Sequence, residues 1–380
     1  SVLQTPILLL GSLIILVLGF KELGGWDEMM RVCGAVTVND YGDTMTNLIR
    51  SNDDANFPWL GALIGSAIIG FWYWCTDQFI VQRVLSGKNE MEARRGTIFG
   101  AYLKLLPVFL FLIPGMIAFA LHQKYIGAGG EGFLPMLANG TANADAAFPT
   151  LVAKLLPAGV KGLVVCGILA ALMSSLASLF NSSAMLFTID FYKRFKPETP
   201  EKKLVGIGQI ATIVIVVLGI LWIPIMRSVG DVLYTYLQDV QSVLAPGIAA
   251  AFLLGICWKR TSAQGGMWGL ISGMVIGLTR LGAKVYYSNA GEVADSTFKY
   301  LFYDMNWLFF CGWMFLFCII VVIVVSLATK APTAEKIQGL VFGTATKEQK
   351  AATRASWNHW DIIHTVIILA ITAAFYWYFW

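Results

Sequence analysis

The stretch that decides the fold reads PWLGALIGSAIIGFWYWCTDQFIVQRVLSGK and covers residues 58–88. Its first part is an apolar run of the length that crosses a membrane as a helix, which is about 20 residues. Tyr73, Trp74, Asp77 and Gln78 then follow within about two helical turns. Polar side chains at the end of an apolar helix are costly in lipid, so this set is a candidate for function.

The composition of the whole chain agrees with a membrane protein. Of the 380 residues, 57% are hydrophobic and 13% are charged, whereas a soluble domain carries about 25% charged residues. Five of the six cysteines lie in apolar runs and none has metal-ligand spacing, so they are interpreted as small apolar residues. The chain opens on an apolar run without an initiator Met, and we expect it to start partway through a longer protein.

Nine apolar runs are long enough to span a bilayer. Because backbone polar groups must be satisfied internally in lipid, each run is predicted to be a helix. The runs cover residues 1–20, 58–82, 96–121, 161–190, 204–226, 232–258, 264–286, 302–329 and 360–380. The predicted fold class is therefore an all-α integral membrane protein.

The charges of the loops predict the orientation. If Ser1 is cytoplasmic, the inner loops hold 16 Lys and Arg and 7 Asp and Glu residues, a net charge of +9, while the outer segments carry a net charge of −3. This difference fits the positive-inside rule, with Ser1 inside and Trp380 outside.

Two polar side chains come to a similar predicted depth. Lys104 lies about 12 Å from the cytoplasmic end of its helix, and Gln238 lies about 10 Å from the outer end of another. An ammonium and an amide together offer the donors and acceptors that a polyhydroxylated ligand needs. Two alternatives stay open: Lys104 can extend back to the interface, and Gln238 can bond to a neighbouring helix.

A stripe of small and hydroxylated residues follows one face of the helix over 161–190. Ala171, Ser174, Ser175, Ser178 and Ser182 recur with the period of a helical face. Small residues allow close helix packing. Hydroxyl and carbonyl oxygens are also the hard ligands that a small cation requires. The sequence leaves both interpretations open.

Tyr73 and Trp74 come out about 22 Å from the outer face, below the level of Lys104 and Gln238. An aromatic side chain at that depth could close a cavity from below. An interfacial aromatic belt is the alternative.

The chain resembles the sodium/glucose cotransporters of the solute:sodium symporter family, and within it the glucose and galactose branch. Motifs in the same order along the whole chain carry this resemblance. They are Trp72-Tyr73-Trp74-Cys75-Thr76-Asp77-Gln78, Val81-Gln82-Arg83, Tyr102-Leu103-Lys104, Leu172-Met173-Ser174-Ser175-Leu176, Tyr236-Leu237-Gln238, Phe252-Leu253-Leu254 and Trp258-Lys259-Arg260.

The resemblance implies a LeuT-type core of two inverted five-helix repeats that works by alternating access. Residues 1–20 would then be the last helix of a mostly missing first repeat. Residues 58–258 would form the second repeat, and 264–380 three accessory helices. Helices one to four of the core would be absent from this chain.

The family's site residues map onto nine positions. Gln238 and Lys104 match residues that hydrogen-bond sugar hydroxyls. Tyr73 matches the inner gate under the sugar ring, with Trp74 beside it, and Tyr234 matches an aromatic position that covers the sugar from outside. Ala171, through its carbonyl, and Ser174 and Ser175, through their hydroxyls, match a sodium site. Gly70 replaces an Asn or Thr that contacts the sugar in relatives, and Ser1 stands where relatives have an Asp.

The predicted function is sodium-coupled symport of a monosaccharide such as glucose or galactose, with Na⁺ as the co-transported ion. Symport of myo-inositol, sialic acid, a carboxylate or proline stays open, as does a sugar-gated sensor without uptake. An enzyme is not expected, because His122, His359 and His364 lie far from any candidate nucleophile. The expected partners are the sugar and the bilayer of the plasma membrane, with no nucleic acid, and the oligomeric state is left open.

Overall fold

The computed structural model describes residues 4–137, 140–229, 233–290 and 294–380, and Ser1 lies outside these ranges. Every element in the described ranges is a helix, so the predicted all-α class is confirmed. The chain divides into two compact units. The first comprises Ser1–Asn47, Gly100–Ile225 and Phe379, and the second Leu48–Phe99, Met226–Tyr378 and Trp380. Boundaries between the units fall within two helices, α5 (Glu90–Pro107) and α10 (Glu201–Val229).

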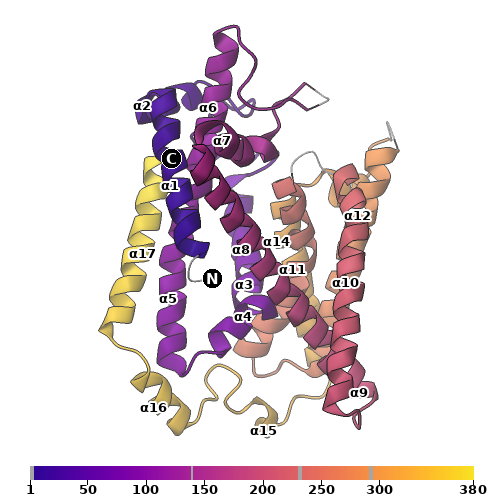
Figure 1. Cartoon of the computed structure of the whole chain (residues 1–380). Helices are drawn as coiled ribbons and strands as arrows, with labels where there is room; N and C mark the ends of the chain where they lie inside the picture. Colours follow the sequence, from indigo (N-terminus) through magenta and orange to yellow (C-terminus); the bar gives the residue numbers. More distant parts are fainter. Residues whose placement is uncertain (1–3, 138–139, 230–232, 291–293) are drawn as a thin grey trace. The chain divides into compact units, whose positions relative to one another are not determined.

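The first unit contains the helices that follow the predicted runs 1–20, 161–190 and 204–226 and most of 96–121. They are α1 (Gln4–Leu23), α2 (Trp26–Gly34), the end of α5, η1 (Val108–Leu112), α6 (Ile113–Gly127), η2 (Ala144–Ala146), α7 (Ala147–Leu155), α8 (Ala158–Met185), η3 (Leu186–Tyr192), α9 (Lys193–Phe195) and most of α10 (Glu201–Val229). Figure 1 shows these helices and their order along the chain.

Small residues bring α1 and α8 close together in the first unit. A side chain at Gly167 of α8 would meet Ile7 of α1, and one at Gly19 would meet Ile117 of α6. The core beside this crossing is apolar and includes the fully buried Ile15, Ile117 and Leu121. In lipid no hydrophobic force drives helices together, so van der Waals packing between closely approaching backbones stabilises their association instead.

The second unit contains the remaining predicted runs. Its elements are α3 (Trp59–Cys75), α4 (Gln78–Leu85), the start of α5, α11 (Leu233–Cys257), α12 (Ala263–Asn289), α13 (Thr297–Lys299), η4 (Tyr300–Asp304), α14 (Trp307–Ala328), α15 (Ala334–Ile337), α16 (Lys347–Ala355) and α17 (His359–Tyr378).

Helices α3, α11, α12 and α14 form the packed part of the second unit. Asn306 Nδ2 donates to the Ala55 carbonyl at 2.7 Å, and the rings of Phe57 and Trp307 lie 6.2 Å apart, so α3 and α14 begin at the same end. In contrast, α12 runs antiparallel to α14, because its first residues lie against Ser326 and its last turns lie near Phe310.

A glycine occurs every fourth residue along one face of α12. Gly265 lies against Ser326, Gly269 against Val322, Gly273 against Gly247 and Gly277 against Val243. Each added Cβ would approach its neighbour too closely, so this face lets α11 and α14 pack directly on the α12 backbone.

The predicted single helix over 58–82 is two helices with a bend of 50° between them. Thr76 Oγ1 donates to the Trp72 carbonyl at 2.7 Å, and Asp77 Oδ1 accepts from the Phe79 backbone N–H at 3.0 Å. Asp77 is therefore the N-cap of α4. Its carboxylate stabilises a helix start, which explains a polar residue at this point of an apolar run.

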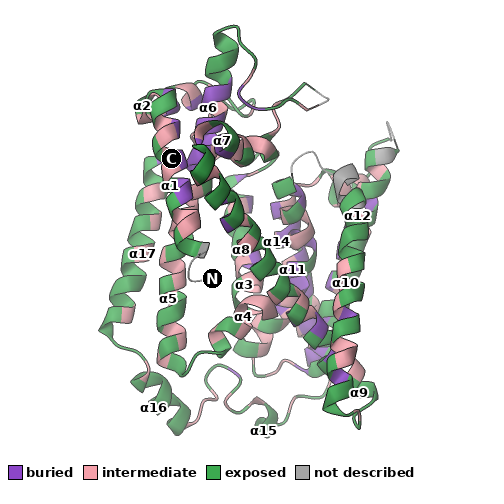
Figure 2. Cartoon of the chain, viewed as in Figure 1, coloured by how far each residue is buried: buried purple, intermediate pink, exposed green. Residues whose placement is uncertain are grey.

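The predicted number of nine membrane spans is not confirmed. Over the described residues, seven helices are long and apolar enough, and counting the bent α3–α4 pair gives eight. Run 264–286 does form α12, which is 27 residues long but is not among them. In Figure 2 most residues of α10 and α17 are exposed, and both helices are among the candidate membrane spans.

Candidate functional site

The nine predicted site residues fall into both units. Lys104, Ala171, Ser174 and Ser175 belong to the first unit, while Gly70, Tyr73, Trp74, Tyr234 and Gln238 belong to the second. The common depth of Lys104 and Gln238 therefore stays a prediction.

Helix α3 has a packed face and an open face. Gly61 and Gly65 lie against Leu308 of α14, and Ile68 and Ile69 pack with Ala245 and Ala249 of α11 and Cys311 of α14 in a small buried cluster. These α3 positions recur at helical spacing on one side.

Gly70 and Trp74 lie on the opposite side of α3, and Tyr73 lies at the flank of the packed face, one turn after Ile69. A Cβ at Gly70 would meet no atom within 4 Å, and Trp74 is 47% exposed. The Tyr73 and Trp74 rings lie edge to face with centroids 5.2 Å apart. The open space at Gly70 and the paired rings next to it can accept a flat ligand face. Their role as a floor under a ligand stays a prediction.

Gln238 and Tyr234 form a hydrogen-bonded pair one turn apart on α11. Gln238 Nε2 donates to the Tyr234 hydroxyl at 2.9 Å. This bond lies within α11, whereas the alternative open from the sequence was a bond to a neighbouring helix. Gln238 also shares a stripe with Ala245 and Ala249, the residues of α11 that pack against α3.

Pro246 does not divide α11, which is helical from Leu233 to Cys257. A proline inside a helix removes one backbone hydrogen bond. The next residue, Gly247, lies against Gly273, and a Cβ added at Gly247 would lie 3.3 Å from the Gly273 Cα. Pro246 thus directly precedes a glycine–glycine backbone contact between α11 and α12.

Three charged residues close to Gln238 form a cluster that the sequence interpretation missed. Lys284 Nζ lies 2.6 Å from Asp239 Oδ2, and Arg280 Nη2 lies 3.4 Å from Asp239 Oδ1. The Arg280 side chain is completely buried. The sequence does contain a signal for this cluster, because Arg280 and Lys284 lie four residues apart inside the apolar run 264–286. In predicting the orientation, they were counted only as charges near a helix end.

In the first unit, Lys104 is exposed on α5, three residues before Pro107. The helix changes at this proline into the π-helical turn η1. Pro107 lacks a backbone N–H, so the regular bonding pattern cannot continue through it. Lys104 therefore stands on the last regular turn before this irregularity.

Ala171, Ser174 and Ser175 lie on one face of α8, with both serines exposed. Ser178 Oγ donates to the Ser174 carbonyl at 3.1 Å, and Ser182 Oγ donates to the Ser178 carbonyl at 2.9 Å. The hydroxyls of Ser178 and Ser182 are thus hydrogen-bonded within their own helix. No such bond occupies the hydroxyls of Ser174 and Ser175 among the described residues.

The oxygens on this α8 face suit a small hard cation. The Ala171 carbonyl keeps a lone pair beyond its helical bond, and each serine adds a hydroxyl oxygen. No group of three or more His, Cys, Asp or Glu side chains that could hold a metal occurs in the described part of the chain. Three neutral oxygens fit a weakly held, transported ion better than a tightly bound one.

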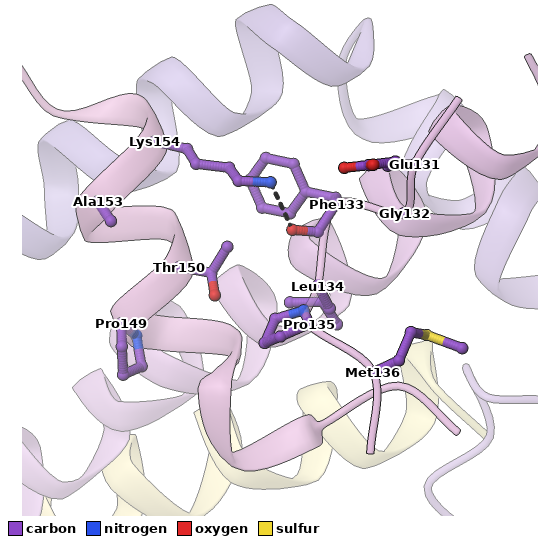
Figure 3. Close-up of a pocket in the computed structure, with 10 residues that line it drawn as sticks. All are labelled: Glu131, Gly132, Phe133, Leu134, Pro135, Met136, Pro149, Thr150, Ala153 and Lys154. Carbon is purple, nitrogen blue, oxygen red and sulfur yellow. Dashed lines mark hydrogen bonds between the residues drawn. The ribbon is translucent and has the colours of Figure 1, made fainter. Parts of the chain in front are cut away.

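A hollow of about 750 Å³ lies in the first unit, and none of the nine predicted positions lines it. Residues 131–136 and α7 line it, and Figure 3 shows Lys154 reaching across it to the Phe133 carbonyl at 2.8 Å. His122 Nδ1 accepts from the Leu134 backbone N–H at 3.0 Å and so supports the same loop. Lys154 and His122 therefore hold the loop of residues 131–136 in place.

Comparison with known proteins gives matches along nearly the whole chain. Residues 1–273 match the family described as "Sodium:solute symporter family". The chain is 34% identical over 398 residues to a sodium/mannose cotransporter of Bos taurus, a match that covers 99% of this chain and 67% of the relative. It is 35% identical to sodium/myo-inositol cotransporter 2 of Homo sapiens and 37% identical to sodium/glucose cotransporter 1 of Ovis aries. Those matches cover 90% and 86% of this chain and 52% of each relative.

A solved structure described as the substrate-bound outward-open state of a Na⁺-coupled sialic acid symporter has a similar fold. The TM-score is 0.58 at 20% identity, over 87% of this chain and 62% of that chain. The family match and the relatives confirm the resemblance expected from the sequence motifs and the expectation of a transporter rather than an enzyme. The roles of the nine predicted site residues stay predictions.

Proposed function

The chain belongs to the sodium:solute symporter family, and from that membership we propose that the protein containing it carries a monosaccharide across a membrane together with sodium. The match of residues 1–273 to the family is the observation that carries this proposal. Relatives named for glucose, mannose and myo-inositol support a polyhydroxylated solute.

The proposed solute contacts come from both units, each supported by its own geometry. On α11, Gln238 has an amide oxygen that can accept from a hydroxyl while its Nε2 is held by Tyr234. On α3, Gly70 leaves space beside the Tyr73 and Trp74 rings. Lys104 of α5 is proposed to donate to solute hydroxyls.

The proposed sodium ligands are the Ala171 carbonyl and the hydroxyls of Ser174 and Ser175. Sodium bound there would favour one of two conformations of the protein, and its loss to the cytoplasm would favour the other. Coupling of solute and ion requires only that sodium bind these two states with unequal affinity. The sodium gradient then drives the solute in one direction.

The proposed architecture is a LeuT-type core that works by alternating access. In it, residues 1–20 end the first five-helix repeat, residues 58–258 form the second, and 264–380 form accessory helices. The proposed setting is the plasma membrane, with Ser1 in the cytoplasm and Trp380 outside. The net charge of +9 on the predicted inner loops supports this orientation.

A polyol such as myo-inositol is the second candidate solute. A relative of that name is 35% identical over 90% of this chain. Gly70 weakens the choice of a sugar, because the position lacks the Asn or Thr side chain that the resemblance implies for a sugar contact.

The test is uptake of labelled solutes by cells that express the intact protein. Glucose, galactose, mannose and myo-inositol are compared in sodium and in choline medium. We expect at least one of them to enter only in sodium, and to be displaced by unlabelled solute. Equal uptake in both media for every solute would contradict the proposal.

A further inference from the structure

The cluster of Asp239, Arg280 and Lys284 has no part in the contacts proposed above. Its single carboxylate faces two cations, and the side chains are 14%, 0% and 24% exposed in that order. Removing charges from water is costly unless partners compensate for the lost hydration. The cluster is therefore stable only while Asp239 keeps both cations in place.

Arg280 connects four elements of the second unit. From α12, its Nη2 donates to the Met305 carbonyl at 2.8 Å and contacts Asp239 of α11. Its Nη1 lies 3.5 Å from the Leu301 carbonyl of η4, and its Cζ lies 4.1 Å from the Phe310 ring centroid of α14. A rigid guanidinium with several fixed partners allows little rotation of the helices around it.

Asp239 directly follows Gln238 on α11. Consecutive residues on a helix point about 100° apart, so holding Asp239 against α12 determines where Gln238 points. That direction is the stripe that continues to Ala245 and Ala249, which pack against Ile68 and Ile69 of α3. On the next turn, Ser242 Oγ donates to the Asp239 carbonyl at 2.6 Å and holds the backbone there.

We propose that Asp239 is a positioning residue for the solute site. Held between Arg280 and Lys284, it sets the rotation of the first turns of α11 and thereby aims the Gln238 amide at the solute. This inference rests on the proposed function, in which Gln238 contacts the solute. The proposed sodium ligands on α8 are not part of the cluster. A change in the cluster should therefore alter the affinity for solute and leave the affinity for sodium unchanged.

The experiment measures sodium-dependent uptake by Asp239→Asn in the intact protein. The amide keeps the size of the side chain but leaves the buried Arg280 and the half-buried Lys284 without a counter-charge. We expect the solute KM to rise about tenfold, with a sodium half-saturation within about twofold of the wild type. Asp239→Glu, which keeps the charge, should recover most of the solute affinity.

Asp295→Asn is the matched control, because it breaks an exposed pair of the same unit, Asp295–Lys299 at 2.8 Å. It should leave both constants unchanged. Uptake is normalised to protein at the cell surface. An Asp239→Asn variant with unchanged KM, or with only a lower maximal rate, would overturn the inference and indicate a purely structural cluster.

Arg280→Lys provides the test if Asp239→Asn does not reach the surface. It keeps the charge but cannot hold Asp239 and the Met305 carbonyl with one planar group. We expect its KM to rise about threefold, and an unchanged KM overturns the inference. A wild-type protein without sodium-dependent uptake contradicts the proposed function instead, which keeps the two failures distinct.

Discussion

At the scale of single residues, the Gln238–Tyr234 pair is the most specific feature of the proposed solute contacts. The bond of 2.9 Å fixes the amide so that its nitrogen faces Tyr234. The amide oxygen is then oriented before any ligand arrives. A prearranged acceptor loses less conformational entropy on binding than a mobile one.

Replacing Gln238 with Leu should raise the solute KM by about tenfold or more. The change removes the amide but keeps a similar volume, so a bound hydroxyl loses its partner at a cost of about 1–3 kcal/mol. Concentration-dependent uptake measures this change. Leu237→Met, at an exposed neighbouring position, is the control and should behave as wild type. An unchanged KM in Gln238→Leu would remove Gln238 from the site.

Cys33 should be unreactive toward maleimide at pH 8 in the folded protein. Burial raises the pKa of this thiol to about 11, and its Sγ contacts the Met116 carbonyl at 3.7 Å. Only the thiolate reacts, so labelling should increase as the pH rises toward 11. Mass spectrometry of the peptide with Cys33 measures labelling, with denatured protein as the positive control. Rapid labelling at pH 8 would show that α6 does not cover this residue of α2.

The chemistry of individual residues was only partly predictable from the sequence. The sequence pattern groups Asp77 and Gln78 with Tyr73 and Trp74 as one polar set, but Asp77 caps α4 by accepting from the Phe79 N–H. An Asp in the sequence can be a helix cap or a ligand contact, and only the backbone geometry distinguishes the two roles. Arg280 was missed because its partners lie 21 to 41 residues away along the chain.

At the scale of elements, α12 is organised by its glycine face. Gly265, Gly269, Gly273 and Gly277 bring its backbone against α11 and α14, while Gly266 on another face has nothing within 4 Å. The same helix carries Arg280 about one turn and Lys284 about two turns after Gly277. The close approach of the backbones is what allows these side chains to reach Asp239.

Gly277→Ala should destabilise the protein by about 1–3 kcal/mol, the usual effect of adding volume to a packed contact. The new Cβ would lie 2.6 Å from Val243 Cγ1 and 2.7 Å from its carbonyl oxygen, and the backbone atom cannot move away alone. Thermal unfolding of the purified protein in detergent measures this loss. Gly266→Ala is the matched control and should unfold at or above the wild-type temperature. Equal midpoints for both variants would contradict the packing of α12 described here.

The positions of helices were predictable because apolar length is a strong constraint in lipid. Eight of the nine predicted runs overlap helices that qualify as spans, alone or as the bent pair, and the ninth forms α12. The bend at 76–77 was not predicted, since no proline or glycine marks it. It arises because Thr76 bonds back to Trp72 while Asp77 starts the next helix.

At the scale of the whole molecule, the chain contains two compact units, and the proposed ion and solute contacts are distributed over both. The sodium ligands Ala171, Ser174 and Ser175 belong to the first unit, and Gln238 with its supporting cluster belongs to the second. The chain spans 67% of the length of one relative and 52% of two others. Transport is therefore proposed for the protein that contains this chain.

Sodium bound at Ser174 and Ser175 is proposed to drive solute accumulation. The most direct measurement is solute uptake into proteoliposomes of the intact protein under an inward sodium gradient, with Ser175→Ala and Ser178→Ala compared. Ser178 is the matched control, because its hydroxyl bonds to the Ser174 carbonyl of its own helix. We predict accumulation above the external concentration for wild type and Ser178→Ala, and its loss in Ser175→Ala together with a weaker sodium dependence. Accumulation by Ser175→Ala with wild-type sodium dependence would contradict the claim.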